Sequence, residues 1–122
     1  MAKLDELKAN QALAISEQSL ALATHRAALQ RALNAKAMVT QREMELSLAR
    51  LSGDAAQIEL AQKSLLEAQE ERHIAVKARK ATADTLSIAK SKTAAATTAV
   101  ETLQTNINTA STVAATKAKN IF

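Results

Sequence analysis

Helix-breaking residues are almost absent from this chain. Its 122 residues include no Pro, and its one Gly, Gly53, lies near the middle of the sequence. Because Pro and Gly interrupt helices most strongly, nearly every position can belong to a helix. Gly53 can adopt the left-handed conformation that ends one helix, and Asp54 with Gln57 has the spacing of a capping box that starts the next. The sequence therefore predicts an all-α fold, a long antiparallel helical hairpin with a tight turn at Gly53.

We expect a single helical-hairpin domain over residues 1–122. The first helix is predicted over about 3–51, the turn over 52–54 and the second helix over about 55–118. The alternative is one uninterrupted helix. A Gly that is followed directly by a capping Asp favours the hairpin, because it both ends one helix and begins another.

Folding the chain back at Gly53 brings together residues whose numbers sum to about twice 53, or 106. This register places Lys36 near Glu70 and Glu43 near Lys63. Both pairs have opposite charges, so we expect them to form weak surface ion pairs between the helices.

The second half of the chain carries a regular coiled-coil pattern, in which seam residues recur at alternating spacings of three and four. Many of them are Ala, which lets packed helices approach closely. The row comprises Ile58, Ala61, Leu65, Ala68, Arg72, Ala75, Arg79, Thr82, Leu86, Ala89, Thr93, Ala96, Val100, Leu103, Ile107, Ala110 and Ala114. Arg72 and Arg79 are expected to pack their aliphatic stems on this row, with their charged heads paired outward.

Further apolar stripes lie beside this row. A hairpin of two helices buries one line on each helix, so the remaining stripes face water unless neighbouring chains complete the packing. In the second half such a stripe runs through Ile74, Ala81, Ile88 and Ala95. In the first half the stripes comprise Ile15, Leu22, Leu29, Leu33, Ala37, Met44, Leu48 and Leu51, and also Leu13, Leu20 and Ala27. The predicted assembly interface comprises Leu65, Leu86, Val100, Leu103, Ile107, Leu22, Leu29 and Leu33, and the predicted turn comprises Gly53 and Asp54.

Nothing in the sequence indicates catalysis, a cofactor or a metal site. The chain has no Cys, and its two histidines, His25 and His73, fall in different helices without ligand partners at metal-binding spacings. Catalytic pockets are usually built from loops on a rigid scaffold, and this chain offers one short turn. We therefore expect a protein that is not an enzyme, with no catalytic, cofactor-binding or metal-binding residues.

The net charge of +4 comes from 16 basic and 12 acidic residues, which are spread along the chain as on a solvated surface. The strongest basic cluster is Lys77, Arg79 and Lys80, followed by Lys90 and Lys92. No aromatic residue lies among these cations to stack on bases, which disfavours nucleic acid as a partner.

Two segments of the sequence are candidates for export or membrane signals. Asp5 and Glu6 stand where a signal peptide would have its apolar stretch, so no cleaved export signal is expected. The weakly charged segment Thr93–Thr116 contains Glu101 and several amides, which would be costly inside a bilayer, so no transmembrane helix is expected. The location stays open between the cytoplasm, export and a virion.

A small, Cys-free, aromatic-poor helical hairpin resembles, in architecture, the subunits of bacterial secretion needles and pili and the ejected internal proteins of short-tailed phages. The closing Asn120-Ile121-Phe122 is similar to the apolar-aromatic tails of needle subunits, although this chain lacks the Pro-containing turn of that pattern. The resemblance implies an export filament or a virion conduit and assigns no residue roles.

The uncovered stripes favour a structural protein that assembles with copies of itself into a bundle, tube or filament. Two alternatives remain. One is a small helical partner or chaperone subunit of a hetero-complex. The other is an amphipathic coat protein on a lipid or granule surface, which the abundance of Ala disfavours.

Overall fold

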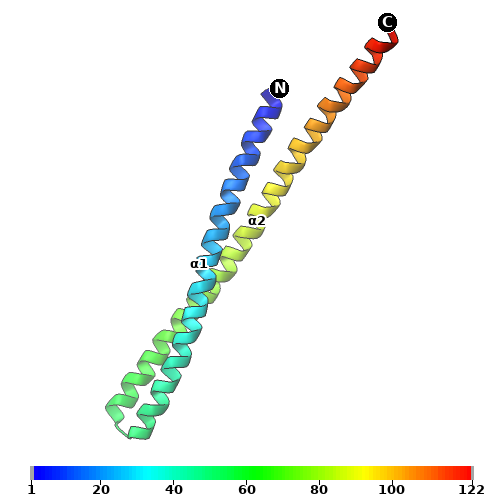
Figure 1. Ribbon diagram of the computed structural model, residues 1–122. Coiled ribbons are helices and arrows are strands. Elements are labelled where there is room, and N and C mark those ends of the chain that lie inside the picture. The colour runs from blue at the N-terminus through cyan, green and yellow to red at the C-terminus, as the bar shows by residue number, and fades with distance from the viewer. Residues whose placement is uncertain (1, 122) are drawn as a thin grey trace. The chain divides into compact units, whose positions relative to one another are not determined.

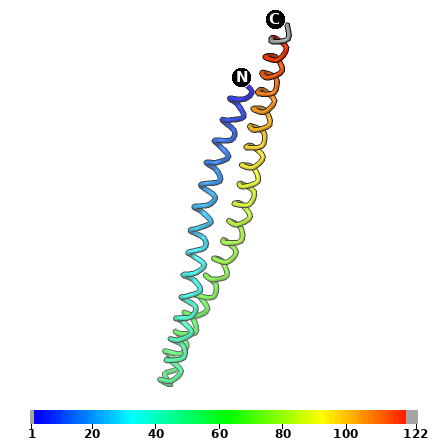
Figure 2. The backbone as a smooth tube through the Cα atoms, turned by 45° about the vertical axis from the view of Figure 1, so that its right-hand side comes forward, coloured from blue at the N-terminus to red at the C-terminus, as the bar shows by residue number. Residues whose placement is uncertain are grey.

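The computed structural model describes residues 2–121, with side chains described through residue 118. It contains two long helices, α1 at Ala2–Ser52 and α2 at Ala55–Ile121, and no strand within the described range. The helices pack against each other as an antiparallel hairpin, and they lie side by side near the turn in both views (Figure 1, Figure 2). The predicted all-α hairpin is confirmed, and the alternative of one continuous helix is wrong.

The turn forms where the sequence places it. Gly53 has φ of +73°, the left-handed conformation that favours Gly, and its N–H donates to the carbonyl of Arg50 at 3.3 Å. Asp54 caps α2, because its Oδ1 accepts from the N–H groups of Ala56 at 3.0 Å and Gln57 at 3.4 Å. These contacts end α1 and begin α2 within two residues.

The reciprocal half of the predicted capping box is replaced by a serine. The N–H of Asp54, which a capping box would pair with the side chain of Gln57, donates to Ser52 Oγ at 3.3 Å. Gln57 Oε1 lies 3.2 Å from the same hydroxyl. The predicted capping box thus forms in one half, where Asp54 Oδ1 accepts from the Gln57 N–H, and in the other half Ser52 supplies the acceptor and links the end of α1 to the start of α2.

The chain groups into two compact units. The turn unit comprises Ala21–Leu86, and the terminal unit comprises Met1–Leu20 together with Ser87–Phe122. Each unit holds a stretch of α1 against an antiparallel stretch of α2.

Small residues form the centre of the turn unit. Ala32 and Ala35 of α1 cluster with Ala75 of α2, and Ala75 is 0% exposed. Val39 and Leu46 are the larger buried side chains of α1 in this unit. An Ala-rich core of this kind allows the two backbones to approach closely.

Side-chain hydrogen bonds fix the register. In the turn unit, His25 Nδ1 lies 2.9 Å from Thr82 Oγ1, and these residue numbers sum to 107. In the terminal unit, Thr93 Oγ1 donates to the carbonyl of Ala14 at 3.2 Å, again with a sum of 107. The observed register therefore lies within one residue of the sum of 106 that a fold at Gly53 predicts.

The two expected ion pairs between the helices, Lys36 with Glu70 and Glu43 with Lys63, do not form within the described part of the chain. All four side chains are exposed. Glu70 and Lys63 lie between the seam positions of α2, on the face that points away from α1. The prediction was wrong because it matched residue numbers without considering which face of the helix each side chain occupies.

α2 continues beyond the part that α1 can cover. It has 67 residues against 51 in α1, and with a register sum of 107 its last stretch has no α1 residue to face. Consistent with this, every residue over 108–118 is exposed. None of the described helices combines the length and apolar character needed to cross a membrane.

Candidate functional site

The candidate functional site of this hairpin is its outer surface. Among the described residues, no group of three or more His, Cys, Asp or Glu side chains could hold a metal ion. His25 is half-buried beside Thr82, and His73 is exposed. Four of the hollows that the described residues line are open grooves along the helices.

The predicted interface residues of α2 lie on its seam, and with the register sum of 107 all of them except Ile107 face a residue of α1 within their own units. Leu86 is buried, and Leu65, Val100, Leu103 and Ile107 are half-buried. For the residues that face α1, packing inside the hairpin thus explains the burial of the side chains without a second chain. A role for them in contacts between chains stays a prediction, and it requires the seam to open.

The predicted interface residues of α1 lie beside its seam rather than on it. Leu22 is half-buried, Leu29 is 38% exposed and Leu33 is 62% exposed. Ala21 and Ala28, each one residue before a stripe leucine, fill the buried positions instead. We call Leu22, Leu29 and Leu33 the α1 stripe; Leu29 and Leu33 lie on the outside of the turn unit, and Leu22 lies at its edge.

The seam of α1 itself is the feature that the sequence analysis missed. Every buried residue of α1 falls on one unbroken row with spacings of three and four. The row comprises Leu4, Leu7, Gln11, Ala14, Gln18, Ala21, His25, Ala28, Ala32, Ala35, Val39, Arg42, Leu46 and Ala49. The regular spacing was visible in the sequence, but polar residues and Ala hold most places, and larger leucines beside the row suggested a different stripe.

Arg72 and Arg79 occupy seam positions of α2, yet both are exposed. With the register sum of 107 they face Ala35 and Ala28, whose small side chains leave room for the arginine stems. The expected outward pairing of their heads was wrong, because neither guanidinium has an ion-pair partner among the described residues. Arg79 lines an open groove of about 430 Å³.

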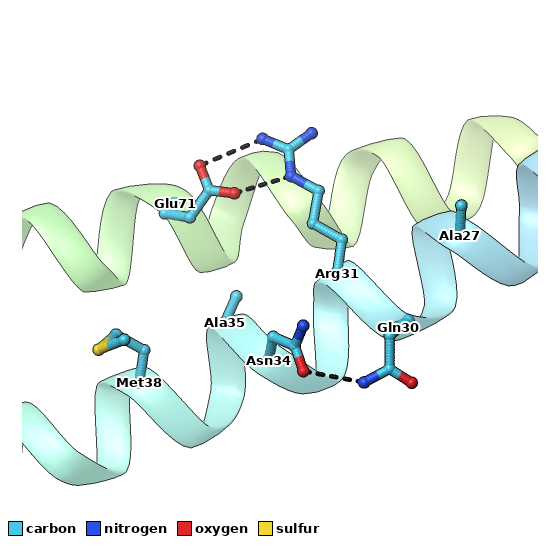
Figure 3. Close-up of a pocket in the computed structure, with 7 residues that line it drawn as sticks. All are labelled: Ala27, Gln30, Arg31, Asn34, Ala35, Met38 and Glu71. Carbon is cyan, nitrogen blue, oxygen red and sulfur yellow. Dashed lines mark hydrogen bonds and ion pairs between the residues drawn. The ribbon is translucent and has the colours of Figure 1, made fainter.

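Two ion pairs are present in the described residues. Arg31 reaches from α1 to Glu71 on α2, with Nε donating to Oε1 at 2.7 Å and Nη2 donating to Oε2 at 3.1 Å (Figure 3). These hydrogen bonds lower the pKa of Glu71 below its usual value. The second pair, Arg42 with Glu45, lies within α1 at 2.8 Å and lowers the pKa of Glu45 in the same way.

The Arg31–Glu71 pair borders an open groove of about 480 Å³ (Figure 3). Ala35 and Met38 supply its apolar lining, and Gln30 Nε2 donates to Asn34 Oδ1 at 2.9 Å along α1. The guanidinium of Arg31 and the carboxylate of Glu71 are hydrogen-bonded to each other, so neither group is free to act as a base or a nucleophile in this groove.

α2 also has an exposed apolar row on its outer face. Leu60 is 66% exposed, Ile74 is 44% exposed, and Ala81 is exposed as well. These residues are spaced in multiples of seven, so they lie along one line of the helix. We call Leu60, Ile74 and Ala81 the outer apolar row of α2.

Comparisons with protein-family models, with curated proteins and with solved structures give no match for this chain, so the surface itself carries the functional argument.

Proposed function

We propose that this chain is a non-enzymatic structural protein, which assembles with copies of itself through the outer faces of the hairpin into a bundle, tube or filament. One observation carries the proposal. Among the described residues, eight of the twelve buried apolar side chains are Ala, whereas fifteen large apolar side chains are exposed. The hairpin thus buries mostly small residues and leaves many large ones outside.

The energetics favour association. Fully burying a Leu, Ile, Val or Met side chain is worth about 1.5–3 kcal/mol relative to leaving it in water. The α1 stripe presents three such groups, and the outer apolar row of α2 presents two, Leu60 and Ile74. Lines of exposed apolar side chains are the usual signature of protein–protein contact on a helical surface.

The resemblance to secretion-needle and pilus subunits and to phage ejection proteins supports a filament or conduit as the form of the assembly. The hairpin architecture carries that support. The tail Asn120–Phe122, which is similar to needle tails, lies outside the residues whose side chains the structure describes. The resemblance thus supports the form of the assembly, and the exposed rows support the surfaces through which the copies would make contact.

Multi-angle light scattering across a range of concentrations, with negative-stain images of the same samples, tests the proposal. We expect masses well above that of a monomer, and a marked loss of mass in Leu33→Asp. Thr40→Asp is the matched control, because Thr40 is exposed and lies seven residues further along the same face of α1. It introduces the same charge without removing a large apolar group.

Three outcomes would contradict self-assembly. A helical monomer at every concentration would show that the exposed rows do not bind other copies of this chain. A largely unfolded chain that becomes helical only with another helical protein would favour the hetero-complex. A gain of helicity only on lipid vesicles would favour the surface coat.

A further inference from the structure

The outer face of α2 carries a row of four charged side chains that form no ion pair with another described residue of the hairpin. Lys63, Glu70, Lys77 and Asp84 recur every seven residues, and all four belong to the turn unit. Each is exposed, and none has an ion-pair partner among the described residues. Along the row the charges alternate in sign, positive, negative, positive and negative.

The charged row runs beside the outer apolar row. Leu60, Ile74 and Ala81 each precede a charged residue by three positions, and side chains three apart are neighbours on a helix. Glu67 takes the remaining place in the apolar row. Together the two rows form a strip, the outer strip of α2, which combines exposed apolar area with an ordered series of charges.

We propose that the outer strip of α2 is a contact between two copies of this chain, in which the two α2 helices run antiparallel about a two-fold axis between Glu70 and Lys77. In an antiparallel pair the second copy of the row runs in the opposite direction. Because the row has four charges of alternating sign, each charge then faces a charge of the opposite sign on the partner subunit. Glu70 therefore meets Lys77 of the partner subunit, and Lys63 meets Asp84 of the partner subunit. The two-fold axis repeats each contact, as in any isologous interface.

The same charges exclude neighbouring arrangements. A parallel copy in register would place Lys77 against Lys77 of the partner subunit. An antiparallel copy shifted by one heptad would place Lys63 against Lys77 of the partner subunit in one direction, or Glu70 against Asp84 of the partner subunit in the other. Since like charges in contact disfavour a pairing, the row favours the proposed antiparallel register over these three arrangements.

The apolar row supplies the attraction at this contact. Exposed ion pairs contribute little affinity but strongly influence orientation and partner choice. Ile74 lies within one residue of the axis, so the two copies of Ile74 meet at the centre of the strip. An extended polyanion fits this strip poorly, because three of the five charged side chains in the strip, Glu67, Glu70 and Asp84, are negative.

This inference rests on the proposed self-assembly and states how two of the copies meet. Its test is a charge swap that uses Glu70→Lys and Lys77→Glu. Each variant alone places like charges at both central contacts, and we expect its self-association to be about tenfold weaker. A mixture of the two variants restores opposite charges at both contacts, so we expect the mixed sample to associate as the original chain does.

Sedimentation velocity of each variant and of the equimolar mixture measures the effect, with circular dichroism to check helicity. Lys36→Glu and Glu43→Lys on α1 are the matched controls, since both positions are exposed, carry no ion pair and change the charge by the same amount. Recovery in the mixture also separates lost contact from misfolding, because a misfolded variant would not be rescued by another.

The outcomes distinguish this contact from the wider proposal. If the original chain assembles but the single variants are unaffected, or if the mixture does not recover, the antiparallel contact is refuted and self-assembly through other faces stands. If the original chain stays monomeric, both proposals fail.

A disulfide cross-linking experiment provides a second test, because the chain contains no Cys that could interfere. In Ile74→Cys the two introduced thiols would lie beside the axis. Oxidised glutathione as the oxidant would then convert the two thiols into one intermolecular disulfide, with the electrons and protons passing to two reduced glutathiones. Thr40→Cys on α1 is expected to cross-link far less. Equal cross-linking of both variants would count against the proposed axis.

Discussion

Gly53 sets the direction of the chain through its backbone alone. Its φ is +73°, and a Cβ placed on it would meet no atom within 4 Å. Gly53→Ala therefore costs only the left-handed conformation, about 1 kcal/mol, which we expect as a loss in the free energy of unfolding in urea. Gly53→Asn should lose less, because Asn tolerates this conformation better. An alanine variant as stable as the original chain would be inconsistent with the turn described above.

The ion pair between Arg31 and Glu71 is the second residue-scale feature with a measurable consequence. Arg31 lowers the pKa of Glu71 from its ordinary 4.5. A carboxylate whose folded pKa is lowered stabilises the fold above its unfolded pKa, and that contribution is lost as the pH falls through the folded value.

We therefore expect Glu71→Gln to lower the melting temperature slightly at neutral pH, since both side chains are about half exposed. The difference from the original chain should disappear on acidification well below pH 4.5. Thermal melts across this range measure it, with the unpaired, exposed Glu43→Gln as the control. A difference that grew towards acid would reverse the assigned sign.

At the scale of the helices, close packing depends on residues that are small rather than strongly hydrophobic. Ala75 is 0% exposed and clusters with Ala32 and Ala35. Ala75→Leu adds volume where the backbones approach, and we expect it to destabilise the hairpin by about 1–3 kcal/mol. Chemical denaturation checks this, with the exposed Ala37→Leu as the control. Equal stability of the two variants would show that the space at residue 75 is not limiting.

The seam of α2 could be predicted from the sequence, whereas the seam of α1 could not. In α2, large residues such as Leu65 and Leu86 share the row with Ala, so hydrophobicity and spacing agree. In α1 the row passes through Gln11, Gln18 and His25, and hydrophobicity points to other positions. A rule that ranks Leu above Ala selects the wrong face where the packing requires small side chains.

The seam of α1 could not be predicted because it depends on which residues of the two helices face each other. With the register sum of 107, Ala21 faces Leu86, a pairing of a small residue with a large one that fills the space between the backbones. Neither helix reveals this pairing by itself. The same limit applies to the candidate surface, because the sequence showed that apolar stripes would be left over but not which stripes the hairpin itself would use.

For the whole molecule, the proposed self-assembly can use hairpins that stay closed or hairpins that open. In the closed hairpin, Leu103 packs towards α1 within the terminal unit, and Leu33 lies on the outside of the turn unit. Because the seam is already filled with complementary residues, we expect assembly to use closed hairpins. Leu103→Asp should then loosen the terminal unit but keep the assembled mass, whereas Leu33→Asp should reduce the mass.

Light scattering gives the mass of each variant, and hydrogen exchange of the backbone amides reports loosening of the terminal unit as a local gain in exchange. The opposite pattern has an equally definite meaning. If Leu103→Asp abolishes assembly while Leu33→Asp has no effect, the seam pairs between chains, and the hairpin must open so that α2 exchanges α1 of its own chain for a helix of a neighbour.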